Sequence, residues 1–392
     1  MGEVIIVGAG PAGSATALSL ARAGVRVRII ERTRFPRRKA CGEYLAPGAV
    51  AALRALDVYA PVRAAAFPIE RLRVSVRGAP ALTLALEREA LAIAREQLDD
   101  LLLQAACAAG ASLQYGRVED VSFDHLGRAN GVVVRAESGD VETIAAPFVV
   151  GADGAGSIVA RKLRLSRPAR RPRKFAVGGH YRGFEGLDSS IEMYVGGGAY
   201  FAINPLGADL ANVMLVVPQR LLAGWSGALD SGIHGAARSL AVGRRSFEGV
   251  ERVGARIAIG PLEHRTRRRA RAGALLVGDA LSFLDPFTGQ GVYLALAGAQ
   301  RAAATVVQAL RNPAREGALL RAYVAVQAQD AAARRRLSAI VDLVLANAWL
   351  ACRVARRIPQ RPRAVAAFTD AMTGISAPHA GFSWRVLGQL LL

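Results

Sequence analysis

Three glycines close to the N-terminus have the spacing of a phosphate-binding turn. Gly8, Gly10 and Gly13 follow the apolar run of residues 4–7 and open a helical pattern that extends to about residue 23. Gly8 permits a tight turn, Gly10 lets backbone approach a pyrophosphate, and Gly13 lets the helix pack closely on the strand. The free amides and the dipole of the helix N-terminus favour phosphate charge. The spacing therefore predicts a dinucleotide site.

An acidic residue completes this motif. Gly24 ends the predicted helix, residues 25–30 form a second strand, and Glu31 follows 21 residues after Gly10. A carboxylate in that place binds ribose hydroxyls, which favours an unphosphorylated ribose such as that of FAD or NAD. The neighbouring Arg32 is suited to stacking on adenine or to contacting phosphate. The order strand, turn, helix, strand is the opening half of a Rossmann-type unit.

A second turn of this kind follows the predicted strand at residues 148–150. It reads Gly151-Ala152-Asp153-Gly154 and leads into a helix that contains Arg161. Asp153 is explained equally well as an N-cap and as a cofactor contact.

A third turn follows the predicted strand at residues 274–277. Gly278 and Asp279 stand at the carboxyl end of that strand, where Asp279 is placed to accept a hydrogen bond from a sugar-like hydroxyl. The amides of residues 289–291 open the next helix and form a positive pocket for the electron-rich edge of a reduced ring. Taken alone, this turn is equally consistent with a purely structural role.

Taken together, the three motifs resemble the FAD fingerprints of the para-hydroxybenzoate-hydroxylase-type flavoprotein superfamily. Residues 35–48 (FPRRKACGEYLAPG) resemble the geranylgeranyl reductase branch of that superfamily, in which a Lys-x-Cys-Gly loop runs beside the isoalloxazine. In this chain the loop contains Lys39, Cys41 and Gly42. The resemblance covers most of residues 1–310.

The resemblance implies a set of FAD ligands. It places the first turn on the pyrophosphate, Glu31 on the adenosine ribose, Arg95 on the FAD linker and the backbone of Val118 on adenine. It places Asp279 on the ribitol chain and the residues after it along the flavin ring. The predicted ligands are Gly8, Gly10, Pro11, Ala12, Gly13, Glu31, Arg32, Lys39, Arg95, Val118, Asp153, Gly278, Asp279, Pro286, Gly289, Gln290 and Gly291.

Three further residues are candidates for the chemistry itself. Cys41 is either a small buried residue or a thiol that faces the flavin and shapes the approach of substrate. A redox role would need a partner thiol, and neither Cys107 nor Cys352 is close in sequence. Tyr44 and Tyr200 are candidate proton donors to a reduced double bond, with packing as the alternative.

The charge balance is strongly basic. The formal charge is +20, and only three of the 51 basic residues are lysines. A GC-rich genome produces the same arginine bias, whereas the functional alternatives are attraction to anionic lipid or to an acidic substrate or carrier. The basic clusters are not interleaved with aromatic residues and no nucleic-acid-binding signature is present, so we expect no nucleic-acid partner.

Other composition features exclude further classes of protein. The three cysteines are too scattered for a disulfide framework or an iron–sulfur cluster, and no two histidines have metal-ligand spacing, so we expect no metal. The N-terminus has no basic n-region and no cleavage site, which predicts a cytoplasmic protein without a signal peptide.

The elements that must position these residues predict an α/β fold. We expect a Rossmann-type FAD-binding domain, an inserted mostly antiparallel β-sheet substrate domain and a helical C-terminal region, with residues 91–109 forming a strong helix. The predicted boundaries are 1–165 for the first part of the FAD-binding domain, with a substrate-domain excursion near 70–90, then 166–260 for the substrate domain, 261–310 for the return and 311–392 for the C-terminal region.

Residues 337–352 are the most apolar helical stretch. Asp342 and Asn347 interrupt it, and it is short for spanning a bilayer. It is either a buried helix or an amphipathic element that lies on a membrane surface through the basic segment after it. The basic residues of that segment are Arg353, Arg356, Arg357, Arg361 and Arg363.

Three functions fit these features. The favoured one is an FAD-dependent oxidoreductase that reduces carbon–carbon double bonds of a lipophilic isoprenoid or polyketide-like substrate, with NAD(P)H or ferredoxin as electron donor. The first alternative is an aromatic monooxygenase that uses NAD(P)H and oxygen, and the second is a flavin-binding protein without turnover. Halogenation is disfavoured, because residues 200–205 (YFAINP) replace the Trp-x-Trp-x-Ile-Pro signature of flavin-dependent halogenases.

Overall fold

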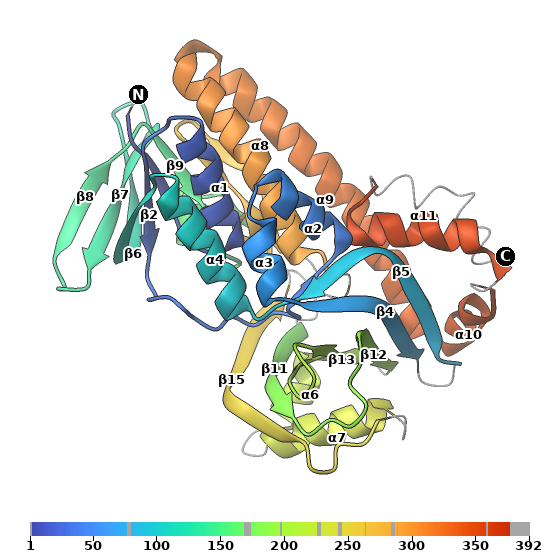
Figure 1. The fold of residues 1–392 in the computed structure, drawn as a ribbon. Coiled ribbons are helices and arrows are strands. Elements are labelled where there is room, and N and C mark those ends of the chain that lie inside the picture. The colour runs from blue at the N-terminus through green and yellow to red at the C-terminus, as the bar shows by residue number, and fades with distance from the viewer. Residues whose placement is uncertain are drawn as a thin grey trace.

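A computed structural model describes residues 2–76, 80–167, 174–196, 198–225, 229–241, 245–262, 264–283, 287, 289–357 and 360–376. Two eight-stranded sheets organise this part of the chain, one in the upper half and one in the lower half of Figure 1. A small third sheet has the order β10-β16-β19 and consists of β10 (Ser166–Arg167), β16 (His264–Thr266) and β19 (Ser282–Phe283).

The first sheet has a parallel centre. Val4 pairs in parallel register with Val27 on one side and with Phe148 on the other. All four residues of β1 are buried and apolar, as expected for a strand covered on both faces. The strand order is β17 (Ala270–Arg271), β18 (Ala274–Leu276), β9 (Phe148–Gly151), β1 (Val4–Val7), β2 (Val27–Glu31), β6 (Ser112–Phe123), β7 (Ala129–Ala136), β8 (Val141–Ala145).

Helices pack around this sheet. The helix α1 (Pro11–Arg22) packs against both α4 (Arg95–Ala108) and α8 (Gly291–Arg311), and α5 (Ile158–Lys162) follows β9. The helix predicted over residues 91–109 begins only at Arg95, so its predicted start was wrong. Leu91 and Ala92 pair with β3 and β4 instead, because the second sheet overrides the helical pattern there.

The second sheet is antiparallel except where β12 pairs with β4 in parallel. It combines two stretches of the chain that lie far apart in sequence, one between β2 and α4 and one after β10. Its order is β15 (Glu251–Leu262), β11 (Lys174–Arg182), β14 (Ala211–Pro218), β13 (Ala199–Pro205), β12 (Ser190–Gly196), β4 (Phe67–Val76), β5 (Leu82–Ala92), β3 (Tyr44–Leu45). The helices α2 (Pro47–Ala55) and α3 (Tyr59–Ala65) connect β3 to β4.

The two faces of the second sheet have different neighbours. On β14, Val213 and Leu215 pack with residues of α7 (Leu229–Ala241), whereas Met214 and Val216 face the opposite way. This alternation follows from the two-residue period of a strand. The helix α6 (Gln219–Ala223) continues directly from β14. The sheets and the helices after α8 confirm the predicted fold class.

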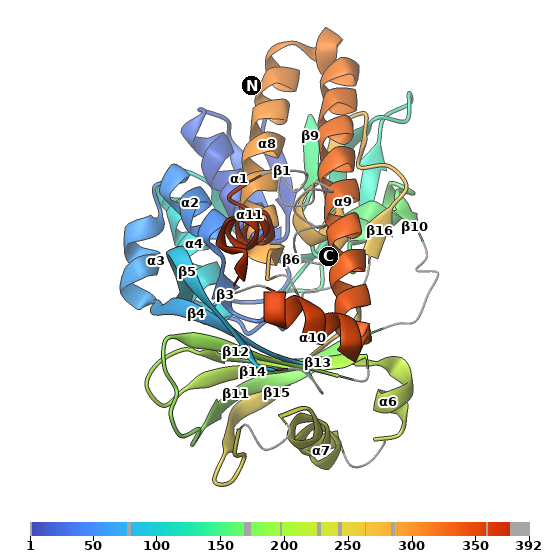
Figure 2. The same cartoon turned by 90° about the vertical axis from the view of Figure 1, so that its right-hand side faces the viewer.

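The C-terminal helices lie beside α8 and above the second sheet, as Figure 2 shows. They are α9 (Glu316–Ala346), α10 (Ala348–Arg357) and α11 (Pro362–Thr373), and short 3-10 turns stand at Gly278–Ala280 and Pro313–Arg315. The apolar stretch at 337–352 is divided at Asn347 between α9 and α10. None of the helices within the described ranges combines the length and apolar character that a membrane crossing requires.

Candidate functional site

A cavity of about 810 Å³ lies between the two sheets and the C-terminal helices. We name its two main parts after their walls. The dinucleotide half is lined by the turn before α1, the ends of β2 and β9, the middle of β6, and the loop before α8. The apolar half is lined by Leu72, Val74, Leu84, Leu86, Ala176, Ile191, Met193, Tyr200, Ala202, Met214, Val216, Ile259 and Leu262.

Almost all of the predicted site residues meet at this cavity. Those that line it are Gly8, Gly10, Pro11, Ala12, Glu31, Arg32, Lys39, Cys41, Tyr44, Arg95, Val118, Asp153, Tyr200, Asp279, Gly289, Gln290 and Gly291. Gly13 and Gly278 do not line the cavity and lie in the layer of residues behind its wall. Pro286 lies outside the described residues.

Close backbone contacts require glycine at two positions of the first turn, Gly8 and Gly13, whereas a Cβ at Gly10 would meet only the Arg37 side chain, at 3.8 Å. A Cβ at Gly13 would stand 1.8 Å from the carbonyl oxygen of Gly8, and one at Gly8 would stand 2.7 Å from that of Ala152. Gly8 also has a φ of +99°, which favours glycine. At Gly278 a Cβ would meet the Cβ of Ala12 at 2.7 Å. Gly13 and Gly278 therefore hold the turn in place from behind.

Glu31 is tied to the turn that it was predicted to complete. Its Oε2 accepts from the amide of Ala9 at 2.8 Å and its Oε1 accepts from the amide of Thr33 at 3.0 Å. The residue is only 6% exposed. Because a carboxylate offers about four acceptor sites, two of them remain for ribose hydroxyls.

A buried ionic cluster stands next to this turn. Arg95 forms a bidentate pair with Asp99, with N–O distances of 2.7 and 2.8 Å. Arg37 lies 3.4 Å from Asp99 and 3.7 Å from Glu31, and its Nε is buried without a hydrogen-bond partner. An orphaned guanidinium nitrogen at the wall fits a phosphate oxygen. Together with the glycine turn it shows that this half suits an FAD pyrophosphate.

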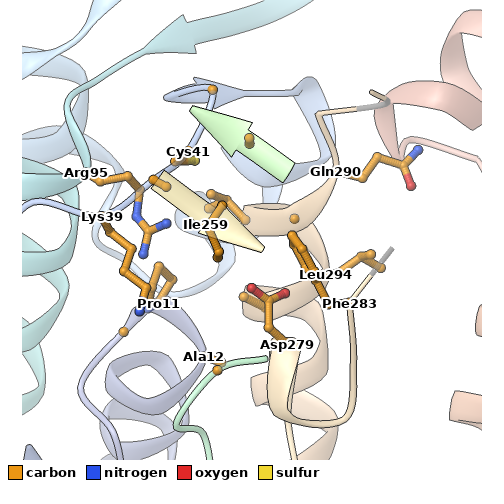
Figure 3. A pocket seen from close by; sticks show the side chains of 18 of the residues that line it. Pro11, Ala12, Lys39, Cys41, Arg95, Ile259, Asp279, Phe283, Gln290 and Leu294 are labelled. Atoms are coloured by element: carbon orange, nitrogen blue, oxygen red, sulfur yellow. The ribbon is translucent and has the colours of Figure 1, made fainter. Parts of the chain in front are cut away.

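Asp279 faces this basic side of the cavity. Figure 3 shows its carboxylate directed into the space from the wall opposite Lys39 and Arg95. Burial raises the pKa of Asp279 to about 6, although Arg95 and Lys39 act in the opposite direction. The pKa of Lys39 is lowered by burial and by its arginine neighbours. A neutral hydroxyl donor such as ribitol suits this carboxyl.

The N-cap residue of α5 is Ser157 and not Asp153, but the Asp153 carboxylate also accepts from amides of the first turn of that helix. Its Oδ2 accepts from the amide of Ile158 at 2.7 Å and from that of Val159 at 3.3 Å, at the start of α5. Its Oδ1 is buried without a hydrogen-bond partner, and burial raises its pKa. The residue also lines the cavity, so the structural and ligand-binding interpretations are compatible. Val118 lies on β6 at the same wall.

The loop before α8 packs against the ring of Tyr44. Gly289 has a φ of +63°, and a Cβ there would stand 2.7 Å from the Tyr44 ring. Burial raises the pKa of Tyr44, so its phenol is neutral. The side chain of Gln290 is directed away from the cavity centre (Figure 3) and donates to the carbonyl of Ala371 at 3.0 Å. The backbone of residues 289–291 therefore forms the wall, while Gln290 joins it to α11.

The loop with Cys41 is held by the second sheet. Asn212 donates to the Cys41 carbonyl at 2.7 Å, and Asn204 donates to the carbonyls of Gly42 and Glu43 at 2.9 Å each. The carboxylate of Glu43 bonds His180 Nε2 at 2.7 Å. The other carboxylate oxygen of Glu43 accepts from the Arg95 amide at 2.9 Å. The loop therefore stands where the two halves of the cavity meet.

Cys41 and Tyr200 occupy the boundary and the apolar half. Burial raises the pKa of Cys41, which keeps it a thiol rather than a thiolate. No disulfide joins any of the three cysteines within the described residues. The ring of Tyr200 meets that of Phe287 edge to face at 5.1 Å. Around Tyr200 the wall is mostly apolar, so the apolar half suits a substrate without charge along most of its length.

Sequence reasoning missed several residues of the site. Arg37 and the Glu43–His180 pair gave no signal, because Arg37 meets Asp99, and Glu43 meets His180, only across a long stretch of sequence. Asp99 was missed although its partner Arg95 is four residues away. The part of the wall that comes from the C-terminal helices was missed as well. It consists of Arg334, Leu337 and Ser338 on α9 and Thr369 and Thr373 on α11, and we name it the C-terminal wall.

Comparisons with known proteins agree with this geometry. A family model described as "FAD binding domain" matches residues 1–208. The chain is 27% identical, over 79% of its length and 78% of the relative's, to 1H-pyrrole-2-carbonyl-[peptidyl-carrier protein] brominase of Pseudoalteromonas luteoviolacea. It is 28% identical, over 82% of both chains, to digeranylgeranylglycerophospholipid reductase 2 of Methanothermobacter thermautotrophicus. The solved structure of the flavin-dependent brominase Bmp2 superposes with a TM-score of 0.85 at 22% identity, covering 96% of both chains.

Proposed function

We propose that this chain reduces carbon–carbon double bonds of a lipophilic isoprenoid or polyketide-like substrate. The premise is its family: the chain belongs to the FAD-binding-domain family and is an FAD-dependent oxidoreductase of the para-hydroxybenzoate-hydroxylase type. One observation carries this proposal: the dinucleotide half of the cavity is continuous with an apolar half, whose wall on the second sheet consists mostly of aliphatic side chains. The similarity to a reductase of geranylgeranyl lipids supports the same class of substrate.

The residues around the flavin position have distinct roles in this proposal. Reduced FAD, when bound, supplies a hydride to one carbon of the double bond, and the other carbon takes a proton. Tyr44 packs against Gly289 and is a neutral phenol, so it is suited to donating that proton. Tyr200 is the corresponding donor from the sheet side. Cys41 shapes the boundary as a neutral thiol.

An oxygen-dependent reaction is the second candidate. The brominase relative and the Asp153 turn favour it, since that turn accompanies pyridine nucleotide use in hydroxylases. The test is turnover with NADPH, NADH or reduced ferredoxin on a polyprenyl alcohol, in nitrogen and in air, with bromide present in a parallel aerobic sample. A reductase turns over under nitrogen and gives a product that carries two hydrogens more than the substrate. Product that forms only in air would favour an oxygenase or halogenase.

We also propose that α10 contacts membrane surfaces that hold the substrate. Trp349 is 68% exposed and Leu343, at the end of α9, is 63% exposed. Arg356, Arg361 and Arg363 are exposed close by in the sequence. Exposed aromatic and aliphatic residues beside arginines suit an anionic lipid interface. Sedimentation with phosphatidylglycerol vesicles, compared with phosphatidylcholine vesicles, tests it, and equal binding to both would contradict the proposal.

A further inference from the structure

Arg334 is a buried cation at the cavity wall. It is 5% exposed and belongs to α9. Its guanidinium donates to Oε1 of Gln290 and lies 5.3 Å from the ring centroid of Tyr293. Its Nε is buried and has no hydrogen-bond partner. No carboxylate pairs with it among the side chains that the structure describes.

The neighbouring acids are already engaged. Asp330, one turn before Arg334 on α9, pairs with Arg301 at 2.6 Å. Asp370 on α11 pairs with Arg88 at 3.6 Å. Each of these carboxylates therefore has its own arginine, and neither forms an ion pair with Arg334.

This arrangement leaves a buried guanidinium without a paired carboxylate among the described side chains. Burial lowers the pKa of Arg334, while Tyr293 and Asp330 act in the opposite direction. A guanidinium nevertheless stays protonated at neutral pH. A buried charge without a counter-ion is costly, so an anion that enters the cavity would gain much of its binding energy here.

Arg37 and Arg334 differ in the carboxylates that lie near them. Both arginines line the cavity and both have a buried guanidinium nitrogen without a hydrogen bond. Arg37, however, lies 3.4 Å from Asp99 and 3.7 Å from Glu31. Arg37 therefore lies near two carboxylates, whereas no carboxylate among the described side chains forms an ion pair with Arg334.

The surroundings of Arg334 define the class of ligand. Ser338 stands one turn further along α9 and offers a hydroxyl to the same wall, and Leu337 lies between them. The helix α9 also contacts β12 of the second sheet, whose Ile191 and Met193 belong to the apolar half. A ligand that fills the apolar half and pairs with Arg334 would combine an apolar body with an anionic end.

We propose that Arg334 binds the carboxylate of a substrate whose remainder is apolar. This inference rests on the proposed function in one respect, namely that the apolar half receives the substrate. The substrate class then narrows from a lipophilic molecule to a lipophilic acid. Ser338 contributes a second hydrogen bond to the same carboxylate.

Calorimetric titration of the purified, flavin-loaded protein with decanoate and with decanol tests this inference. The two probes have the same chain and differ in the charged group. We expect decanoate to bind about tenfold or more tightly than decanol, because hydrogen bonds to a charged partner are strong. Acetate should compete weakly with decanoate and not at all with decanol. Equal affinities for decanoate and decanol would overturn the proposal, and so would acetate binding as tightly as decanoate.

Variants locate the effect on one side chain. Arg334→Gln should reduce decanoate affinity to that of decanol, Arg334→Lys should retain part of the preference, and Ser338→Ala should lower it by a few-fold. Arg336→Gln is the matched control, since it removes the same charge from an exposed position on α9 and should leave both affinities unchanged. An unchanged decanoate affinity in Arg334→Gln would overturn the proposal.

The test separates this inference from the proposed function. Calorimetry measures the preference of the wild-type protein for the acid, whether or not a reduced product is found. Turnover under nitrogen without a preference for decanoate would contradict the anion site alone. A preference for decanoate without turnover would contradict the reductase alone.

Discussion

The two halves of the cavity are built from different kinds of constraint. In the dinucleotide half, backbone contacts and buried ion pairs allow few residue types, as at Gly13 and Asp99. In the apolar half, aliphatic side chains on alternating strand positions line a surface that many hydrophobic residues would also form. Cofactor binding should therefore be sensitive to substitutions that add or remove a single atom. Substrate binding should depend mainly on the volume of the apolar half and on the few polar groups at the edge of that half.

The largest effect should come from the first turn. Gly13→Ala places a methyl group 1.8 Å from the Gly8 carbonyl oxygen, and neither backbone can move without disturbing the turn. We expect the purified variant, after incubation with FAD and removal of the unbound cofactor, to retain less than about a tenth of the flavin that the wild type binds. The visible absorbance of the protein measures the bound flavin. Gly207→Ala is the control, because a Cβ there meets nothing within 4 Å. Full flavin content in Gly13→Ala would show that the turn is not the cofactor cradle.

Asp279→Asn should separate cofactor binding from stability. Burial raises the pKa of this carboxyl to about 6. The folded state binds the proton more tightly than the unfolded chain, so the wild type loses stability as pH rises from about 4 to about 6 and does not regain it above. The variant without FAD should therefore be more stable than the wild type by about 1–3 kcal/mol near pH 8 and equally stable near pH 4, in urea unfolding.

The same variant should bind FAD about tenfold more weakly, because an acceptor of a ribitol hydroxyl is lost. Fluorescence titration with FAD measures this. Lower stability without FAD near pH 8, or unchanged FAD affinity, would contradict the assignment of Asp279.

A change of volume in the apolar half should leave the flavin in place. Ala202→Phe adds a ring to the cavity wall and should raise the KM for an apolar substrate by about tenfold, with unchanged flavin content. Ile203→Val, one residue further on the same strand, removes a methylene from the opposite face beneath α7. It should cost about 1 kcal/mol of stability and leave KM unchanged. If Ala202→Phe expelled the flavin instead, the two halves would not be separable.

The smallest effect should come from the exposed basic residues. Arg356→Gln should weaken binding to phosphatidylglycerol vesicles by about fivefold, since each basic residue at an anionic surface contributes about 1 kcal/mol. His125→Gln, far away in the β6–β7 loop, is a control that should change nothing. Vesicle binding that is insensitive to Arg356 and to salt would exclude the basic segment as the contact.

The same contrast explains what could be predicted from the sequence. The glycine turn, Glu31 and Asp279 were predictable because their chemistry requires residue types at short spacing. Tyr44 and Cys41 were found through family resemblance, since a single tyrosine or cysteine carries no local signal. The start of α4 was misplaced because strand pairing at Leu91 competes with helical periodicity.

The remaining parts of the site depend on long-range packing. Arg37 and Asp99 meet only after α4 packs against α1. Arg334 resembles the other arginines of an arginine-rich helix, and only its burial and its position at the cavity distinguish it. In a chain with 51 basic residues, composition hides the few that are buried.

Reduction of the flavin-loaded protein by light under nitrogen, followed by addition of an unsaturated polyprenyl acid, tests the central claim most directly. The account predicts that the visible absorbance of oxidised flavin returns without oxygen and that the acid gains two hydrogens. If the protein stays bleached until air is admitted, and the acid is recovered unchanged under nitrogen, the reductase assignment is wrong.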